Sequence, residues 1–463
     1  MNSVVGKLII LSVPFQRINR VLLSPPVLKA IERDDKIAIV SPFANHPEFQ
    51  SEYLDDRVIF LETPSINRKI RLVSILYEVS EILRMYGHWR KYKNSGTRYH
   101  NLIRKYKLGI DGADKKYTGF LRYYFSLFSW LGKIKILWKV IDNLLGKRIY
   151  NFPDLVNLCK KYENVVLIQS ASWGEQDRML AWHARKLHWK SIMIPYTTDQ
   201  LYCNGYLLLD YDYICVQGPK EESFAKQYHS VNESKLIRLG NTWFRHIEEL
   251  TQKINIRDRH EKVICYAGCS NVYFPSESEF FALDFLINAI KRAELENVSI
   301  MYRPLVESEE EGNIIRERYE NVPFLTIQFA QKACYSLEDV GTTSQKEQLV
   351  EYLEQVSHVD LLIMSYATTL SIDLAFLGIP TISNFVDHTG TLAKRNTHLR
   401  LNSESRIEGI ESIPVIEDMG NMIPTIKDLL YNKVSAKGQS EFTKNQWDFA
   451  QTDFDSTLKA ILK

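Results

Sequence analysis

The chain has 463 residues, of which 45% are hydrophobic and 25% charged, a composition that excludes collagen-like, disordered and multi-span membrane proteins. This length exceeds what one hydrophobic core usually holds, so we expect two domains. The formal net charge is only +2, but residues 66–150 contain 19 Lys or Arg against five Asp or Glu, so the rest of the chain is acidic.

The first 65 residues alternate short apolar runs with helical segments, which is typical of parallel βαβ units. The predicted strands are "KLIILSV", "KIAIVSPF" and "RVIFLET", and the first is better explained as a buried strand than as a signal peptide. The six cysteines show no CxxC or zinc-site spacing, so we interpret them as reduced thiols. Both observations favour a cytoplasmic protein.

Residues 66–150 interrupt this pattern with long helical segments in which 15 aromatic residues are interleaved with the basic ones. No uncharged stretch of 18 residues occurs there, so the segment is not predicted to span a membrane. Basic and aromatic residues together suit the headgroup zone of an anionic membrane, and we expect peripheral attachment at the inner face of the plasma membrane. The alternatives are an ordinary aromatic core and a nucleic-acid surface. No nucleic-acid-binding signature accompanies the segment, so no such partner is predicted.

The βα alternation resumes near residue 165 and, after a polar segment at 245–260, begins again with "KVICYAGCS". We therefore predict an α/β protein with two Rossmann-like, doubly wound domains, residues 1–250 and 251–439. The basic and aromatic segment is then a helical insert in the first domain.

Residues 440–463 are predicted to form one amphipathic helix, because apolar residues recur there at helical spacing. These residues are Trp447, Ala450, Phe454, Leu458 and Ile461. Such a stripe must dock on another part of the protein.

The run "VDLLIMSYATTLSIDLAFLGIP", residues 359–380, combines a buried strand with a polar exit. Open parallel sheets bind ligands at the carboxyl ends of their strands, where Ser365 lies. Thr368 or a neighbour caps the next helix, whose amino end suits a phosphate. Thr369 and Asp373, four residues apart, share a helix face. This arrangement suits a nucleotide diphosphate with its ribose near Asp373. The simpler alternative is that the hydroxyls only cap the helix and Asp373 is solvated.

This run resembles the donor site of GT-B glycosyltransferases, particularly bacterial enzymes that build capsule, lipopolysaccharide and teichoic-type polymers, and it also resembles nucleotide-sugar 2-epimerases. "SIMIPYTTDQLYCNGYLLLDYDYICVQGPKEESFAKQY" is similar to the end of their N-terminal domain, and "LIRLGNTWFR" to the strand that leads to their linker. The resemblance covers much of residues 165–385. It implies the GT-B fold, a nucleotide-sugar donor, and residues 440–463 crossing back onto the N-terminal domain.

Carried over position by position, the resemblance implies a set of donor-binding residues at the strand ends of the second domain. These residues are Gly268, Ser270, Arg303, Ser365, Thr368, Thr369 and Asp373. A glycine admits close approach of a pyrophosphate, and an arginine neutralises its charge. Relatives often have a His before the proline that here follows Arg303, and this chain has none. No metal and no cofactor are predicted, because helix dipoles and basic side chains serve the phosphates in this fold.

Inverting sugar transfer also requires a base that takes the proton of the acceptor hydroxyl. Asp177 is our first candidate and Glu175 the second, because both follow the strand "VVLI" at the start of a helix. The alternative is that these acids only complement the helix dipole. His46 is a further candidate base, and Arg17 and Arg20 are candidates for holding an anionic acceptor.

The predicted function is therefore a glycosyltransferase that moves a sugar from a nucleotide-activated donor to a surface-glycan or lipid-linked acceptor. The alternatives are a nucleotide-sugar 2-epimerase and a non-catalytic, membrane-associated polysaccharide assembly protein. The basic insert favours the transferase, because an epimerase needs no platform for an acceptor.

Overall fold

The computed structural model describes both predicted domains. The described residues are 4–15, 18–64, scattered positions from 127 to 149, 150–170, 174–197, 200–203, 207, 209–251, 261–269, 274–306, 308–329, 345–366, 368, 370–386, 388–390 and 413–463. The insert predicted for residues 66–150 thus lies outside the described residues, apart from positions at its end.

A seven-stranded, all-parallel sheet with the order β3-β2-β1-β4-β5-β6-β7 forms the first domain. Its strands are β1 (Val4–Ser12), β2 (Lys36–Ser41), β3 (Val58–Glu62), β4 (Tyr162–Gln169), β5 (Lys190–Met193), β6 (Tyr213–Val216) and β7 (Leu236–Arg238). The predicted parallel βαβ pattern is confirmed here.

A six-stranded, all-parallel sheet with the order β10-β9-β8-β11-β12-β13 forms the second domain. Its strands are β8 (Lys262–Ala267), β9 (Val298–Arg303), β10 (Leu325–Ile327), β11 (Leu361–Ser365), β12 (Thr381–Asn384) and β13 (Val415–Ile416). All five residues of β11 are buried, as expected for a central strand covered on both faces.

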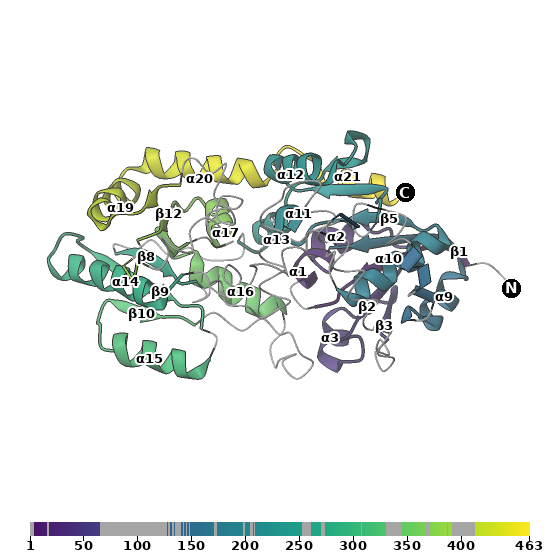
Figure 1. The fold of residues 1–463 in the computed structure, drawn as a ribbon, viewed down its shortest axis with the longest axis horizontal. Helices are drawn as coiled ribbons and strands as arrows, with labels where there is room; N and C mark the ends of the chain where they lie inside the picture. Colours follow the sequence, from purple (N-terminus) through teal and green to yellow (C-terminus); the bar gives the residue numbers. More distant parts are fainter. Residues whose placement is uncertain are drawn as a thin grey trace.

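Helices cover both faces of each sheet (Figure 1). In the first domain they are α1 (Asn19–Leu22), α2 (Pro25–Ala30), α3 (Pro47–Glu52), α9 (Pro153–Cys159), α10 (Glu175–Leu187), α11 (Gln200–Cys203), α12 (Pro219–His229) and α13 (Thr242–Thr251). In the second they are α14 (Ser276–Lys291), α15 (Glu309–Tyr319), α16 (Gln345–Val356), α17 (Leu370–Phe376) and α19 (Met422–Tyr431). The chain ends with α20 (Lys433–Trp447) and α21 (Phe454–Leu462), of which α21 belongs to the core of the first domain.

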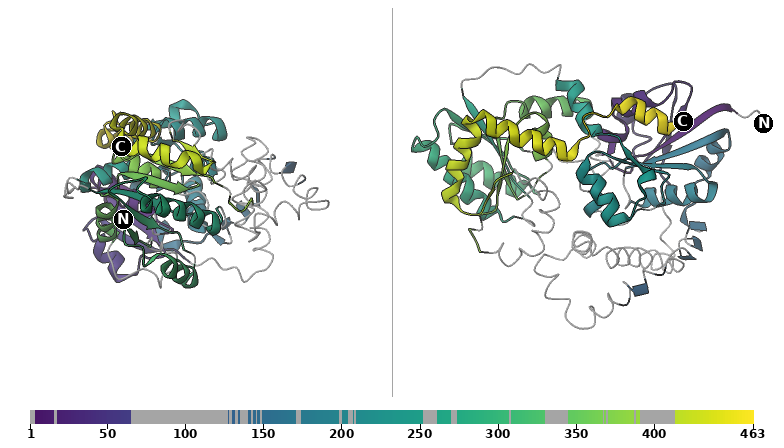
Figure 2. Two further views of the ribbon diagram at one scale, coloured as in Figure 1. Left: turned by 90° about the vertical axis from the view of Figure 1, so that its left-hand side faces the viewer. Right: turned by 90° about the horizontal axis from the view of Figure 1, so that it is seen from above.

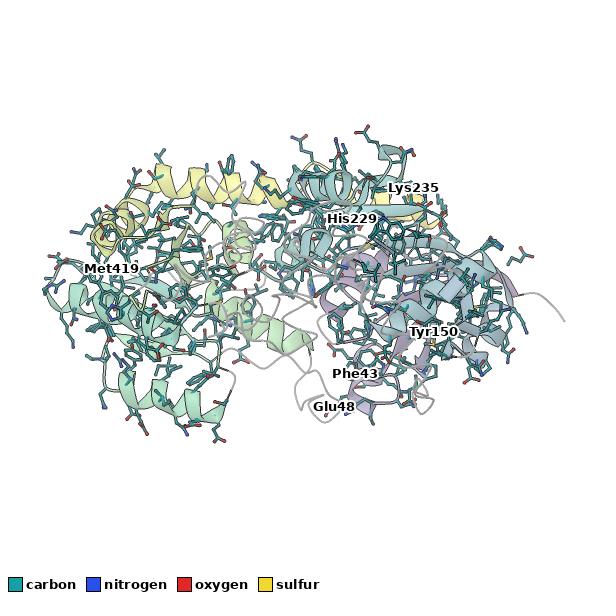
Figure 3. All side chains as sticks on the ribbon, viewed as in Figure 1. Phe43, Glu48, Tyr150, His229, Lys235 and Met419 are labelled. Carbon is teal, nitrogen blue, oxygen red and sulfur yellow. The ribbon has the colours of Figure 1, made fainter. Side chains whose placement is uncertain are left out.

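Successive side chains of a strand point to opposite faces of the sheet, so the core of the first domain has two layers, one on each face. Leu8 and Ile10 of β1 pack with α9, α10 and α12, whereas Ile9 and Leu11 pack with α1, α2 and α21. All four side chains are completely buried. Side chains fill the space around both sheets in the same way (Figure 3).

Each sheet reverses its strand order beside its first strand, between β1 and β4 and between β8 and β11. Open α/β sheets bind ligands outside the carboxyl ends of the strands at such a switch point. The elements that follow the strands, including α1, α13, α16 and α17, lie in the middle of the molecule between the two sheets (Figure 1). The carboxyl ends of both sheets are therefore directed towards each other.

The end of the chain differs from the single helix predicted for residues 440–463. Helix α20 ends at Trp447, the backbone of Asp448 is extended, and α21 begins only at Phe454. Helix α20 runs from the second domain to the first, and α21 packs against α2 (Figure 2). Ala450 is exposed, so it does not belong to the buried stripe.

The crossing segment is fastened to the first domain through Asp448, whose side chain is fully buried. Its carboxylate accepts the backbone N–H of Asn241 at 2.7 Å and forms an ion pair with Arg245 at 3.2 Å. A side chain on Gly218 would collide with the backbone of Trp447, so this close approach requires a glycine.

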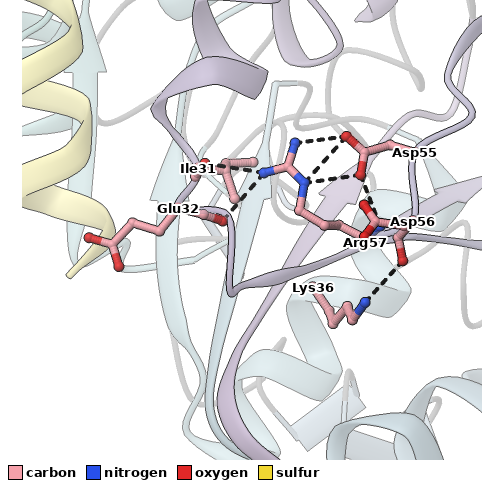
Figure 4. A network of polar contacts seen from close by, with 6 residues as sticks. All are labelled: Ile31, Glu32, Lys36, Asp55, Asp56 and Arg57. Carbon is pink, nitrogen blue, oxygen red and sulfur yellow. Dashed lines mark hydrogen bonds and ion pairs between the residues drawn. The ribbon is translucent and has the colours of Figure 1, made fainter.

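A second polar network lies at the opposite edge of the first sheet, where β2 and β3 begin (Figure 4). The Arg57 guanidinium binds the Asp55 carboxylate and also donates to the backbone carbonyls of Ile31 and Glu32, each at 3.3 Å. Lys36 donates to the backbone carbonyl of Asp56. These contacts fasten the start of β3 to the end of α2 and lie away from the strand exits.

None of the helices in the described part of the chain combines the length and the apolar character that crossing a bilayer would require.

We expect Asp448→Ala to destabilise the protein by about 3 kcal/mol, because it leaves Arg245 and the Asn241 N–H without their buried acceptor. Thermal unfolding monitored by circular dichroism measures this change. Glu441→Ala, which removes an exposed ion pair with Lys437 on the same helix, is the matched control and should change stability by less than about 0.5 kcal/mol. Equal effects of the two substitutions would contradict the account.

Candidate functional site

Three side chains meet at the switch point of the first sheet. Ser12 ends β1, Gln169 ends β4, and Asp177 lies in the first turn of α10. The Ser12 hydroxyl donates to Asp177 Oδ1 at 2.6 Å, and Gln169 Nε2 lies 3.3 Å from the same oxygen. Gln176 extends the network, because its Nε2 donates to the Ser12 hydroxyl at 3.1 Å and to the Val40 carbonyl at 2.8 Å.

The Asp177 carboxyl is completely buried, so its ionised form loses the hydration that it would have in water. Burial raises its pKa to about 7, although the hydrogen bonds from Ser12 and Gln169 act in the opposite direction. A backbone hydrogen bond from Gly174 also lowers this pKa, but by less than burial raises it. The first candidate base is therefore a carboxyl group that exchanges its proton near neutral pH.

The other candidates near the first sheet differ from Asp177. Glu175 is the first residue of α10 and is half-buried. His46 precedes α3 and is half-buried. Arg17 lies outside the described residues, and only the backbone of Arg20 is described. His46 does not take part in the described hydrogen bonds around Asp177.

Two histidines that were not singled out from the sequence, the buried His183 and the half-buried His229, each contact a backbone carbonyl. His183 Nε2 lies 2.9 Å from the Tyr150 carbonyl, and His229 Nε2 lies 2.6 Å from the Leu201 carbonyl. Burial lowers the pKa of His229 to about 4, so this ring stays neutral at physiological pH.

At the switch point of the second sheet, hydroxyl and amide groups converge on one buried phenol. Tyr266 Oη, from β8, accepts the Ser365 hydroxyl of β11 at 3.0 Å and the Asn384 amide of β12 at 3.0 Å. Ser365 is therefore directed into the sheet rather than into solvent. Tyr366, which follows it, has a φ of 65°, an uncommon conformation for a bulky residue and one that concentrates at functional sites.

Glu279, which was not predicted from the sequence, lies in the first turn of α14 and is 4% exposed. Its Oε1 accepts the Tyr302 hydroxyl of β9 at 2.5 Å, and its Oε2 accepts the backbone N–H of Cys269 at 3.1 Å. A signal was present in the sequence, since Glu279 shares the helix face of the buried residues Ala282 and Leu283.

Arg303 ends β9, as predicted, and its side chain is half-buried. Its Nη1 donates to Gln328 Oε1 at 2.9 Å, and its guanidinium lies 5.5 Å from the centre of the Tyr352 ring. The strand exits of the second sheet therefore carry a positive charge held by a neutral amide and an aromatic face.

Asp373 lies on α17 but connects to other elements. Its Oδ1 accepts Trp243 Nε1 of α13 at 2.9 Å, and its Oδ2 accepts the Tyr352 hydroxyl of α16 at 2.8 Å. Next to these bonds, the rings of Phe244 and Phe376 stack at 4.6 Å. The residue that we assigned to the ribose thus also joins the first domain to the second.

The remaining predicted donor residues are only partly described. The Thr368 hydroxyl accepts the backbone N–H of Leu370 at 3.4 Å, which is a weak cap on α17. Gly268 follows β8 directly. Ser270 and Thr369 lie outside the described residues. No group of three metal-ligating His, Cys, Asp or Glu side chains occurs within the part of the chain that is described.

We expect the stability of the wild-type protein to fall between about pH 4 and pH 7, because the unfolded chain releases the Asp177 proton there while the folded protein keeps it. Asp177→Asn removes this dependence, so its free energy of unfolding relative to wild type should increase by up to about 4 kcal/mol from pH 4 to pH 8. Urea unfolding at several pH values measures this difference. For Asp154→Asn, at an exposed position in the first turn of α9, the difference in free energy of unfolding from wild type should be the same at every pH. A constant difference for Asp177→Asn as well would contradict the prediction.

No family model matches the chain, and no curated protein matches it. Solved structures do match over nearly its whole length. S. aureus MnaA in its structure with UDP has a TM-score of 0.52 at 11% identity, covering 98% of this chain and 95% of MnaA. A UDP-N-acetylglucosamine 2-epimerase has a TM-score of 0.51 at 10% identity, covering 99% and 94%. A glycosyltransferase from Rickettsia africae has a TM-score of 0.44 at 9% identity, covering 99% of each chain. Structural matches at such low identity show the fold alone, and the predicted two-domain GT-B architecture is confirmed.

Proposed function

We propose that the protein is a metal-independent glycosyltransferase that moves a sugar from a nucleotide-activated donor to a surface-glycan or lipid-linked acceptor. The observation that carries this proposal is the buried Asp177 carboxyl at the switch point of the first sheet, with a pKa of about 7. A general base works best when its pKa lies near the operating pH. In the GT-B fold, the second sheet provides the donor-binding part of the site, because its strand exits suit a nucleotide sugar.

In the proposed reaction, the acceptor reaches the Asp177 carboxylate, which is covered in the free protein. The carboxylate takes the proton of the acceptor hydroxyl while the hydroxyl oxygen forms the bond to the anomeric carbon. The bond from this carbon to the diphosphate breaks, and its electron pair leaves with the nucleotide diphosphate. Ser12 and Gln169 orient the carboxylate through Oδ1. Glu175, half a turn away, is the second candidate for the base.

On the donor side, Arg303 balances the negative charge that develops on the leaving diphosphate. Backbone groups near Gly268 and Ser270 and the hydroxyls near Thr368 and Thr369 contact the phosphates, and Ser365 supports them from the strand end. Asp373, which accepts hydrogen bonds from Trp243 and Tyr352, is the acceptor that we assign to the ribose hydroxyls.

A nucleotide-sugar 2-epimerase is the second candidate. It is favoured by MnaA with UDP and by the UDP-N-acetylglucosamine 2-epimerase, both of which match the chain with TM-scores above 0.5. An epimerase would release an isomerised nucleotide sugar without any acceptor. Analysis of the products by mass spectrometry and nuclear magnetic resonance distinguishes the two reactions.

We expect Asp177→Asn to lower the transfer rate at least about 100-fold, because the base contributes that much to proton transfer. The affinity for the free nucleotide, measured by calorimetry, should stay within about threefold of wild type. Glu175→Gln is the matched variant in the same helical turn and should lower the rate by less. Wild-type turnover in both variants would remove the assignment of the base.

We further propose that the acceptor is reached at an anionic membrane surface through residues 66–150. At the described positions of this segment, several apolar side chains are exposed: Leu127, Trp130, Ile134, Val140 and Leu144. Exposed apolar groups together with the basic residues of the sequence suit the interface of an anionic leaflet.

The protein should therefore sediment with vesicles that contain anionic lipid and not with neutral ones. Trp130→Ser combined with Leu144→Ser should reduce the bound fraction several-fold, because both side chains are exposed and apolar. Exposed Leu54, in the first domain outside this segment, provides the control substitution Leu54→Ser, which should have no effect. Equal binding to both kinds of vesicle, or binding to neither, would refute membrane attachment.

A further inference from the structure

Glu279 forms hydrogen bonds at the carboxyl ends of two neighbouring strands of the second sheet, β8 and β9. Its carboxylate takes the Tyr302 hydroxyl, next to Arg303 at the end of β9, and the Cys269 backbone N–H, in the loop after β8. Of these strands, β8 borders the switch point that the proposed function assigns to the donor, and β9 is its neighbour in the sheet. Because Glu279 is almost completely buried, these bonds are not weakened by competing water.

The position of Glu279 also explains why residue 268 is a glycine. A Cβ atom at Gly268 would collide with Oε1 of Glu279 and lie 2.9 Å from Oε2. The φ of Gly268 is not in the left-handed region, so its backbone conformation is open to other residues. The constraint at this position is therefore the carboxylate beneath the loop, rather than backbone strain.

We propose that Glu279 is a positioning residue that fixes the backbone of Gly268 and Cys269 for contact with the diphosphate of the donor, a role that rests on the proposed function. The carboxylate acts from beneath the loop and does not touch the ligand. It holds the loop so that the side away from Glu279 faces the phosphates. It also links the loop to the end of β9, where Arg303 lies.

The chemistry of the carboxylate suits this role. An apolar residue at position 279 would remove the acceptor that the Cys269 N–H and the Tyr302 hydroxyl share, and losing a buried hydrogen bond is unfavourable. Glutamine keeps one acceptor for Cys269 and offers its amide to Tyr302, whose hydroxyl can also accept. Alanine keeps neither bond. The pair of variants therefore separates the hydrogen bonds from the bulk of the side chain.

The test combines two measurements on the full chain. Hydrogen exchange followed by mass spectrometry reports the Cys269 region without any ligand, and calorimetry measures the affinity for whichever of UDP, GDP and CDP stabilises the wild type most. We expect Glu279→Ala to accelerate exchange and to weaken nucleotide binding, each at least about tenfold, while Glu279→Gln stays within about threefold of wild type. Glu277→Ala, at an exposed position in the same helical turn, is the matched control and should change neither.

A double substitution tests the explanation for the glycine. Gly268→Ala alone should disturb the loop, whereas Gly268→Ala in the Glu279→Ala background should be no worse than Glu279→Ala alone, because the colliding carboxylate is gone. Equal additional loss of binding in both backgrounds would instead mean that the ligand itself needs the glycine, and would overturn the inference.

Unchanged exchange at Cys269 in Glu279→Ala would also overturn the positioning role, whatever happens to binding. If wild type binds none of the three nucleotides, the proposed function fails and the ligand role of Glu279 fails with it. In that case, accelerated exchange in Glu279→Ala would still show that Glu279 fixes the loop, although the loop serves no nucleotide.

Discussion

The relative placement of the two sheets depends on the first turn of α13, which two carboxylates from other parts of the chain hold in place. Asp448 from the crossing segment accepts the N–H of Asn241, just before the helix, and Asp373 from α17 accepts Trp243 Nε1. Phe244 adds a ring stack against Phe376. Because α13 follows β7 almost directly, a shift of this turn would move the carboxyl end of the first sheet relative to the second.

The two switch points that this arrangement brings together have different electrostatics. In the first sheet, burial raises the pKa of a single carboxyl, Asp177, to about 7, so its proton is available near neutral pH. In the second sheet, Arg303 supplies a positive charge above a buried network of phenols and hydroxyls. The strand exits of the first sheet therefore suit proton transfer from an acceptor, and those of the second sheet suit an anionic leaving group. This division is what transfer from a nucleotide sugar requires.

The fold was predictable because its main signals are local. Short apolar runs such as the residues of β1 and β11 separate cleanly from helical segments, and two repeats of this pattern imply two parallel sheets. The break between Trp447 and Phe454 was not predictable, because the apolar spacing continues across it and the helix end coincides with contacts to distant residues, such as those of Asp448 with Asn241 and Arg245. The site was predicted in part: the strand exits were found, but Glu279 and the partners of Asp373 depend on contacts between residues far apart in sequence.

The central claim is that a nucleotide sugar binds at the strand exits of the second sheet, opposite Asp177. A crystal structure of the protein soaked with a hydrolysis-resistant nucleotide-sugar analogue tests it most directly. The account predicts the diphosphate beside Arg303 and the loop at Gly268, with the anomeric carbon directed towards Asp177. A nucleotide bound at any other place, or with its sugar directed away from the first sheet, would contradict it.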